Sequence, residues 1–136
     1  MKHTFVVDGD PVGKGRPRFT KGGRAYTPKR TKDYEARVRK AYIESNGPYF
    51  GKQPVSMIIT ANFGMPKSWT KKQKRELNGK YATNKIDSDN ILKCAMDALL
   101  EIAYTDDRQV VVCTASKWWK ETGSLEVEIE SLSEVE

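Results

Sequence analysis

The sequence is poor in the residues that build disulfide scaffolds and zinc sites. Among its 136 residues are two cysteines and a single histidine, His3, near the start of the chain. A structural zinc site takes about four ligands of these types, and a disulfide scaffold needs several cysteine pairs, so both are excluded. Cys94 and Cys113 each lie in a stretch of apolar periodicity. We expect both to be reduced core residues of a cytoplasmic protein.

Long apolar runs are also missing. No segment approaches the roughly 20 residues that a membrane span requires, and residues 1–7 are too short for the apolar part of a signal peptide. We therefore expect a cytoplasmic protein without a membrane partner. A length of 136 residues suits one domain, here residues 1–136, and about two-thirds of the unfolded surface of such a chain can be buried.

Positive charge is abundant and unevenly distributed. The net charge is +6, but residues 12–40 hold eleven Lys or Arg against two acids, and residues 67–85 hold seven against one. Residues 121–136 hold six glutamates and no base. Clustered bases favour a polyanion as partner, because each phosphate contact releases condensed counterions. Solubility alone is the alternative explanation.

A segment rich in glycine, proline and bases spans residues 9–30. Its glycines and prolines exclude a long regular element. Phe19 and Tyr26 alternate with the bases, so they either stack on nucleotide bases or pin the loop to the body. Loops of this length inside compact domains are usually functional, and we expect this one to contact nucleic acid.

The spacing of apolar residues predicts an α+β domain. A strand at 4–7, a helix from 28 or 31 to 45 and an alternating strand at 55–63 come first. A short basic helix follows, capped by Ser68 or Thr70 and ended by Gly79. An amphipathic helix within 86–102 precedes two strands, 109–119 and 124–131, which we expect to close the fold as a hairpin. This order implies one small domain with a mixed β-sheet and two main helices.

Asp87 and Asp89 are the first candidate site residues. If the chain is still extended there, a period of two places both carboxylates on one side. Mg²⁺ usually binds through one or two carboxylates together with waters and phosphate oxygens. The alternative is that Asp89 caps the following helix and Asp87 forms an Asx turn into it. For an isolated D-x-D-N motif before a helix, capping is the more frequent explanation.

Lys93 and Asp107 extend this candidate site. Lys93 follows Asp89 by one helical turn and shares its face. A lysine beside a metal-bound phosphate can hold the attacking water or stabilise developing charge, although alone it is an ordinary surface ion pair. A helix from about residue 90 to 101 carries the chain roughly 18 Å away, and six extended residues return about 20 Å. Asp107, or its neighbour Asp106, can therefore just reach the same site.

In combination, these motifs resemble the RusA family of Holliday junction resolvases. The family pattern D-x-D-N-x-x-K matches residues 87–93, D-A-L matches 97–99, and D-D-x-Q-V matches 106–110. The opening of the chain also resembles that of phage and Gram-positive relatives. The resemblance implies a RusA-like fold and a homodimer with two active sites placed across a four-way junction or other branched DNA.

The resemblance also implies the roles of individual residues. Asp87, Asp89 and Asp107 would bind Mg²⁺, for which Mn²⁺ would substitute, and together with Lys93 they would form the catalytic set. Asp97 matches a shared position and is expected to orient Lys93. The bases expected to contact DNA are Lys14, Arg16, Arg18, Lys21, Arg24, Lys29, Arg30, Lys71, Lys72 and Lys85.

The function predicted from these features is Mg²⁺-dependent, structure-specific cleavage of DNA. Paired cuts in strands of like polarity would resolve Holliday junctions in recombination and repair. One alternative is a non-catalytic DNA- or RNA-binding protein whose acids are helix caps. A second is an assembly factor whose bases face an acidic protein, and a third is a nuclease that acts on duplex, flap or other branched DNA.

Overall fold

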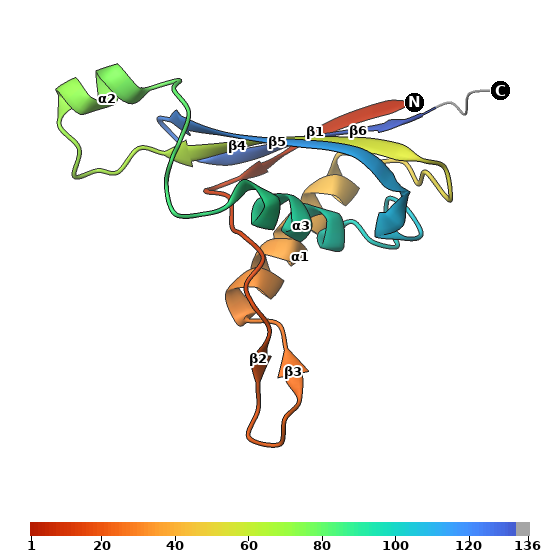
Figure 1. Cartoon of the computed structure of the whole chain (residues 1–136). Helices are drawn as coiled ribbons and strands as arrows, with labels where there is room; N and C mark the ends of the chain where they lie inside the picture. Colours follow the sequence, from red (N-terminus) through yellow and green to blue (C-terminus); the bar gives the residue numbers. More distant parts are fainter. Residues whose placement is uncertain (133–136) are drawn as a thin grey trace.

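A four-stranded mixed sheet, in the order β1-β6-β4-β5, forms the frame of the molecule in the computed structural model, which describes residues 1–132 (Figure 1). β6 pairs antiparallel with both β1 and β4, whereas β4 and β5 run parallel. A mixed sheet was predicted, and it is confirmed. The strands are β1 Lys2–Asp8, β4 Val55–Gly64, β5 Val110–Lys120 and β6 Ser124–Ser131.

The prediction of a closing hairpin is wrong. β5 and β6 follow one another in the chain, but β4 lies between them and pairs with both. β4 lies at the centre with one face, Val55, Met57, Ile59, Ala61 and Phe63, buried under the helices; on its other face Ser56 and Asn62 are buried, whereas Ile58 is 41% exposed. β5, which is largely exposed along residues 111–114, is left at the edge.

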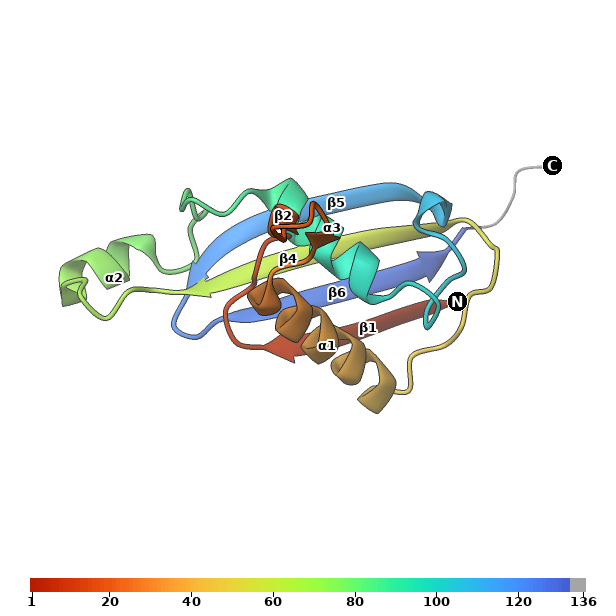
Figure 2. The same cartoon turned by 90° about the horizontal axis from the view of Figure 1, so that it is seen from below.

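Two helices cover one face of the sheet, α1 over the β1 side and α3 over the β5 side (Figure 2). α1 spans Lys29–Glu44, as predicted, and α3 spans Ser88–Ala98, the middle of the predicted window. Arg39 of α1 donates from Nε to the carbonyl oxygen of Ala98 at 3.1 Å and so joins the two helices. Their buried residues are Thr31, Tyr34, Val38 and Tyr42 of α1, and Ile91, Cys94, Ala95 and Ala98 of α3.

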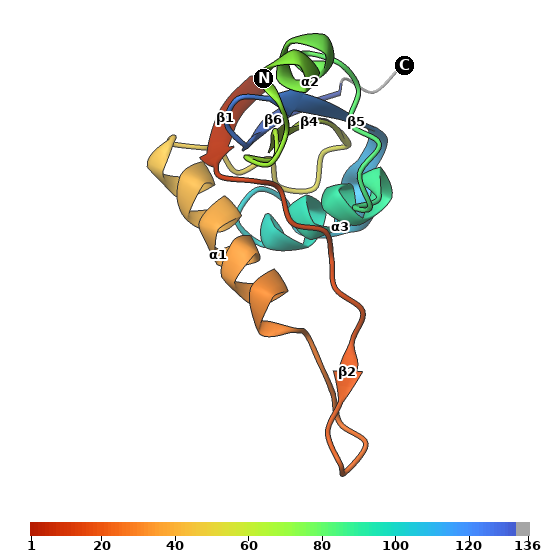
Figure 3. The ribbon, with the colours of Figure 1, turned by 90° about the vertical axis from the view of Figure 1, so that its left-hand side faces the viewer.

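Residues 17–27 form a β-hairpin, which we call the arm, that projects away from the sheet (Figures 1 and 3). Its strands are β2 Arg18–Phe19 and β3 Ala25–Tyr26. Two backbone hydrogen bonds of 2.9 Å, from Thr20 N to Arg24 O and from Gly23 N to Thr20 O, close the turn. Phe19 and Tyr26 are 69% and 43% exposed, so the expectation that they pin the loop to the body is wrong.

A second basic element, α2 Lys71–Leu77, extends from the end of the sheet on a loop (Figure 1). Thr70 caps it, and the Gln73 side chain completes a capping box by accepting from the Thr70 N–H. No residue of α2 is buried. Trp69 in the preceding loop packs on Trp119 of β5 with ring centroids 4.8 Å apart, which anchors the start of the helix.

The two cysteines differ in their surroundings. Cys94 lies on the inner side of α3 and is buried, as predicted. Cys113 is exposed on β5, so the prediction that Cys113 is a core residue is wrong. The segment 79–82 pairs with the end of β5, where Trp119 N donates to Lys80 O and Ala82 N to Lys117 O. The same segment does not extend over the start of the strand, and Cys113 lies there. No helix within residues 1–132 has the length and apolarity needed to cross a membrane.

Candidate active site

A groove of about 460 Å³ runs between the base of the arm, the start of α1 and the segment that leads into α3. Its charged lining is strongly basic at one side and acidic only where it meets Asp87 at the start of α3. Val12, Pro28 and Ile86 supply apolar lining. An electropositive groove with one acidic end can hold a phosphate chain and present it to the carboxylate. The bases that line it are Lys14, Arg16, Arg18, Arg30 and Lys85.

The start of α3 places the Asp87 carboxylate at this groove and the Asp89 carboxylate two residues further along the chain, and neither is used as a cap. Asp87 is the N-cap residue, but its side chain makes no capping hydrogen bond, and Asp89 lies in the first helical turn. Capping therefore does not explain either residue. The expectation of an extended chain through both is also wrong, because Asp89 is already helical. Both residues are exposed, and neither side chain forms an ion pair within residues 1–132.

Lys93 lies between two carboxylates. Its Nζ is 3.2 Å from Asp97 Oδ1 and 3.3 Å from Asp107 Oδ2, and about half of its side chain is exposed. The hydrogen bond to Asp97 raises the pKa of Lys93 above its ordinary value, and the bond to Asp107 adds to this effect. Lys93 is therefore a fixed cation at neutral pH, suited to stabilise negative charge and unsuited to accept a proton.

Asp107 reaches Lys93 within the same chain because α3 ends at Ala98 and leaves nine residues for the return. The loop that carries Asp107 is fastened by Gln109. The amide oxygen of Gln109 accepts from Asp106 N at 2.8 Å, and its nitrogen donates to Gly51 O at 2.6 Å and Gln53 O at 2.9 Å. This explains why a glutamine follows the aspartates in the D-D-R-Q-V motif.

The two neighbouring aspartates have different partners. Asp106 caps the short 3-10 helix Asp107–Gln109. The backbone N–H of Arg108 hydrogen-bonds Asp106 and lowers the pKa of that carboxyl, and the Arg108 side chain adds to the effect. Asp106 is therefore engaged in the local turn, whereas Asp107 faces Lys93. This arrangement favours Asp107, as the resemblance implied, as the third site carboxylate.

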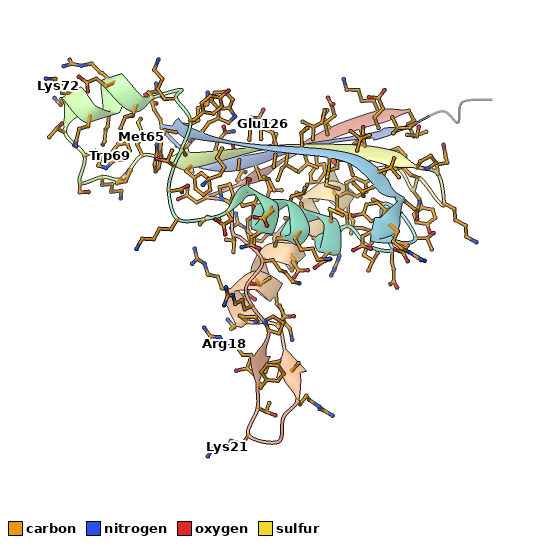
Figure 4. The ribbon with its side chains drawn as sticks, viewed as in Figure 1. Arg18, Lys21, Met65, Trp69, Lys72 and Glu126 are labelled. Carbon is orange, nitrogen blue, oxygen red and sulfur yellow. The ribbon has the colours of Figure 1, made fainter. Side chains whose placement is uncertain are left out.

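The predicted DNA-contacting bases fall into four groups. Lys21 and Arg24 lie toward the tip of the arm, and Lys71 and Lys72 lie on α2 (Figure 4). Lys29 forms an exposed pair with Asp33 at 3.4 Å. Arg16, Arg18, Arg30 and Lys85 line the groove.

Lys14 does not belong with these bases, because its amine points into an internal ion pair. Its Nζ is 2.9 Å from Glu35 Oε1 and 3.1 Å from Asp97 Oδ2. Lys14 is therefore not expected to contact phosphate. Sequence analysis missed Glu35 altogether, since an acid on the polar side of a helix carries no local signal of a distant partner.

Carboxylates are suitable ligands for a divalent cation, but here they do not surround a common point. Within residues 1–132, no three His, Cys, Asp or Glu side chains are placed to hold a metal ion among themselves. Asp87 and Asp89 offer unpaired, exposed oxygens, which are the ligands of hard cations. A site of this kind fits a cation that takes its remaining ligands from water and from phosphate.

A basic groove that meets the exposed carboxylate of Asp87, with Lys93 further along the same helix, is suited to bind a phosphodiester. The family model for the endodeoxyribonuclease RusA matches residues 8–130, and the chain therefore belongs to the RusA family. The chain is also 35% identical over 136 residues to the uncharacterized protein YqaN of Bacillus subtilis (strain 168), covering 95% of this chain and 96% of that protein.

Proposed function

We propose that this protein is a Mg²⁺-dependent endonuclease that resolves four-way DNA junctions as a homodimer. The observation that supports the proposal best is the groove, because its bases lead directly to Asp87. Membership of the RusA family agrees with DNA as the substrate. Two-fold symmetry of a dimer would match two sites to two strands of like polarity.

In this mechanism, Asp87, Asp89 and Asp107 would hold the divalent cation, with water and phosphate oxygens supplying its other ligands. Bound Mg²⁺, or Mn²⁺ in its place, would activate water and neutralise charge on the reacting phosphate. Lys93 contributes a fixed positive charge beside the same phosphate and stabilises the charge that develops during cleavage. Lysine is protonated at neutral pH, and the hydrogen bond to Asp97 raises the pKa of Lys93 further.

Substrate choice in this proposal depends on DNA shape. The arm and α2 are two separate basic projections at different parts of the molecule (Figures 1 and 4). Phosphate contacts position DNA without reading its sequence. Two such contacts in different directions therefore favour a branched substrate, whose duplex arms diverge, over a single straight duplex.

The test is cleavage of a synthetic four-way junction beside a linear duplex of the same sequence, with Mg²⁺ or with EDTA. Wild type, Asp89→Asn and a surface control, Glu44→Gln, are compared. We expect paired nicks near the branch point in wild type and control, and none in Asp89→Asn despite retained binding. Sedimentation velocity at the same concentrations measures whether the active species is a dimer.

Each of the other possible results supports a different function. Tight junction binding without nicks in any divalent metal would indicate a non-catalytic branched-DNA-binding protein. Equal cutting of linear duplex or flap DNA would indicate a nuclease with a different substrate. Weak binding of all DNAs at low salt would exclude a DNA partner.

A further inference from the structure

Five charged side chains form a continuous chain from the interior of the protein to the candidate active site. Glu35 of α1 pairs with Lys14, and Lys14 pairs with Asp97 of α3. The other oxygen of Asp97 pairs with Lys93, and Lys93 pairs with Asp107. The four N–O distances are 2.9, 3.1, 3.2 and 3.3 Å in this order.

The inner end of this chain is more enclosed than the outer end. The side chains of Glu35, Lys14 and Asp97 are 14%, 24% and 22% exposed. Those of Lys93 and Asp107 are 52% and 34% exposed. Screening by water is therefore weakest around Lys14, where an ion pair holds its geometry best.

The backbone on both sides of Lys14 is closely packed against neighbouring segments. A Cβ at residue 13 would come within 3.2 Å of the Ile86 side chain, and one at residue 15 would come within 2.9 Å of Thr31 Oγ1, so a larger residue would fit tightly at 13 and would force a shift at 15. Between them, Lys14 N donates to Asn90 O at 2.9 Å. The G-K-G sequence thus threads the chain between α1 and α3.

We infer that Lys14 and Glu35 are positioning residues of the active site. Lys14 holds Oδ2 of Asp97, which leaves Oδ1 directed at Lys93 and fixes the direction of the Lys93 ammonium. Glu35 holds Lys14 in place and balances its charge. Without Lys14, the Asp97 carboxylate is free to turn, and Lys93 loses its fixed direction toward the phosphate.

This inference rests on the proposed function, because the rate it predicts is that of DNA cleavage. Lys14→Met should lower the single-turnover cleavage rate about tenfold or more, since small displacements of a reacting group cost rate steeply. Junction affinity in EDTA should match that of the control Lys40→Met, which removes one exposed base from α1. Lys14→Arg should recover most of the rate, and Glu35→Gln should lie between.

A spectroscopic measurement separates positioning from a purely structural role. The Lys93 ammonium, held by two carboxylates, should give an observable ¹⁵N–¹H signal near neutral pH, which the Lys93→Arg variant assigns. We expect this signal to broaden or vanish in folded Lys14→Met and to persist in Lys40→Met. A rate that falls only in proportion to the folded fraction, with the Lys93 signal unchanged, would overturn the inference.

The two proposals can fail separately. If wild type cuts no DNA, the proposed function fails, while the dependence of the Lys93 signal on Lys14 still tests the inferred geometry. If wild type cuts junctions and Lys14→Met cuts them at the same rate, only the positioning role is refuted.

Discussion

Three arm bases, Arg18, Lys21 and Arg24, make no ion pair within residues 1–132. Each is exposed, so each is free to replace a counterion on a DNA phosphate. The perturbation is their joint replacement by glutamine. We expect the triple variant to bind four-way junctions more weakly and with a shallower dependence on salt.

The expected size follows from the number of charges removed. Each phosphate contact on duplex DNA contributes about 0.9 to the slope of log K against log salt, so three contacts contribute about 2.7. Between about 50 and 200 mM salt, a fourfold range, this slope corresponds to a factor of about 40 in affinity. Wild type should therefore lose about 40-fold more affinity than the variant across this range.

The assay is fluorescence anisotropy of a labelled junction in EDTA at several KCl concentrations. The matched control replaces Lys2, Lys40 and Lys52 by glutamine, which also lowers the net charge from +6 to +3. Lys2 pairs with Glu128 and Lys40 with Glu44, and the three control bases are absent from the groove lining. Equal slopes for the two triple variants would refute the reasoning, because net charge alone would then explain the binding.

Three further results are expected. Phe19→Ala should weaken binding to a four-way junction by about 1–3 kcal/mol while leaving linear duplex binding unchanged, since aromatic stacking needs an exposed base face, which a branch point offers and the interior of a duplex does not; equal losses on both DNAs would exclude stacking. Ellman's reagent should titrate Cys113 in the native protein and Cys94 only after unfolding, because burial raises the pKa of Cys94 to about 12. Burial lowers the pKa of Lys14 but hydrogen bonds to two carboxylates outweigh it, so its folded pKa lies above the ordinary 10.5. Thermal unfolding should therefore show wild type more stable than Lys14→Met below pH 10.5, with the difference lost as the pH rises further, whereas a constant difference would contradict this linkage.

Much of the fold could be predicted from the sequence because the apolar residues of the buried faces recur at the spacing of a strand or a helix. Val55 to Phe63 alternates so that its apolar residues share a face, and that face is buried in β4. In β6, Leu125, Val127 and Ile129 are buried, and the glutamates that alternate with them point away from the helices. Such periods identify a strand and its inner side.

Periodicity does not identify the neighbour of a strand, and the wrong predictions follow from this limit. A short connection between two strands is typical of a hairpin, but β4, which is distant in sequence from both, lies between β5 and β6 and pairs with each of them. Cys113 follows three valines in the sequence, yet it lies where the sheet edge has no cover within residues 1–132.

The candidate site was predictable where its residues are close in sequence. Asp87, Asp89 and Lys93 were identified together because a helical turn relates them. The partners of Lys14 were not, since Glu35 and Asp97 come from two helices that only the folded sheet brings together. Ion pairs between distant segments produce no residue spacing that could be recognised in the sequence.

The pairing of the first strand with the last has a consequence for biosynthesis. β1 bonds along its whole length to β6, from Lys2 opposite Glu130 to Asp8 opposite Ser124. A ribosome must therefore make about nine-tenths of the chain before β1 and β4 acquire the strand that lies between them. Contacts so distant in sequence also slow folding. A sheet of this topology stays incomplete until β6 has been synthesised.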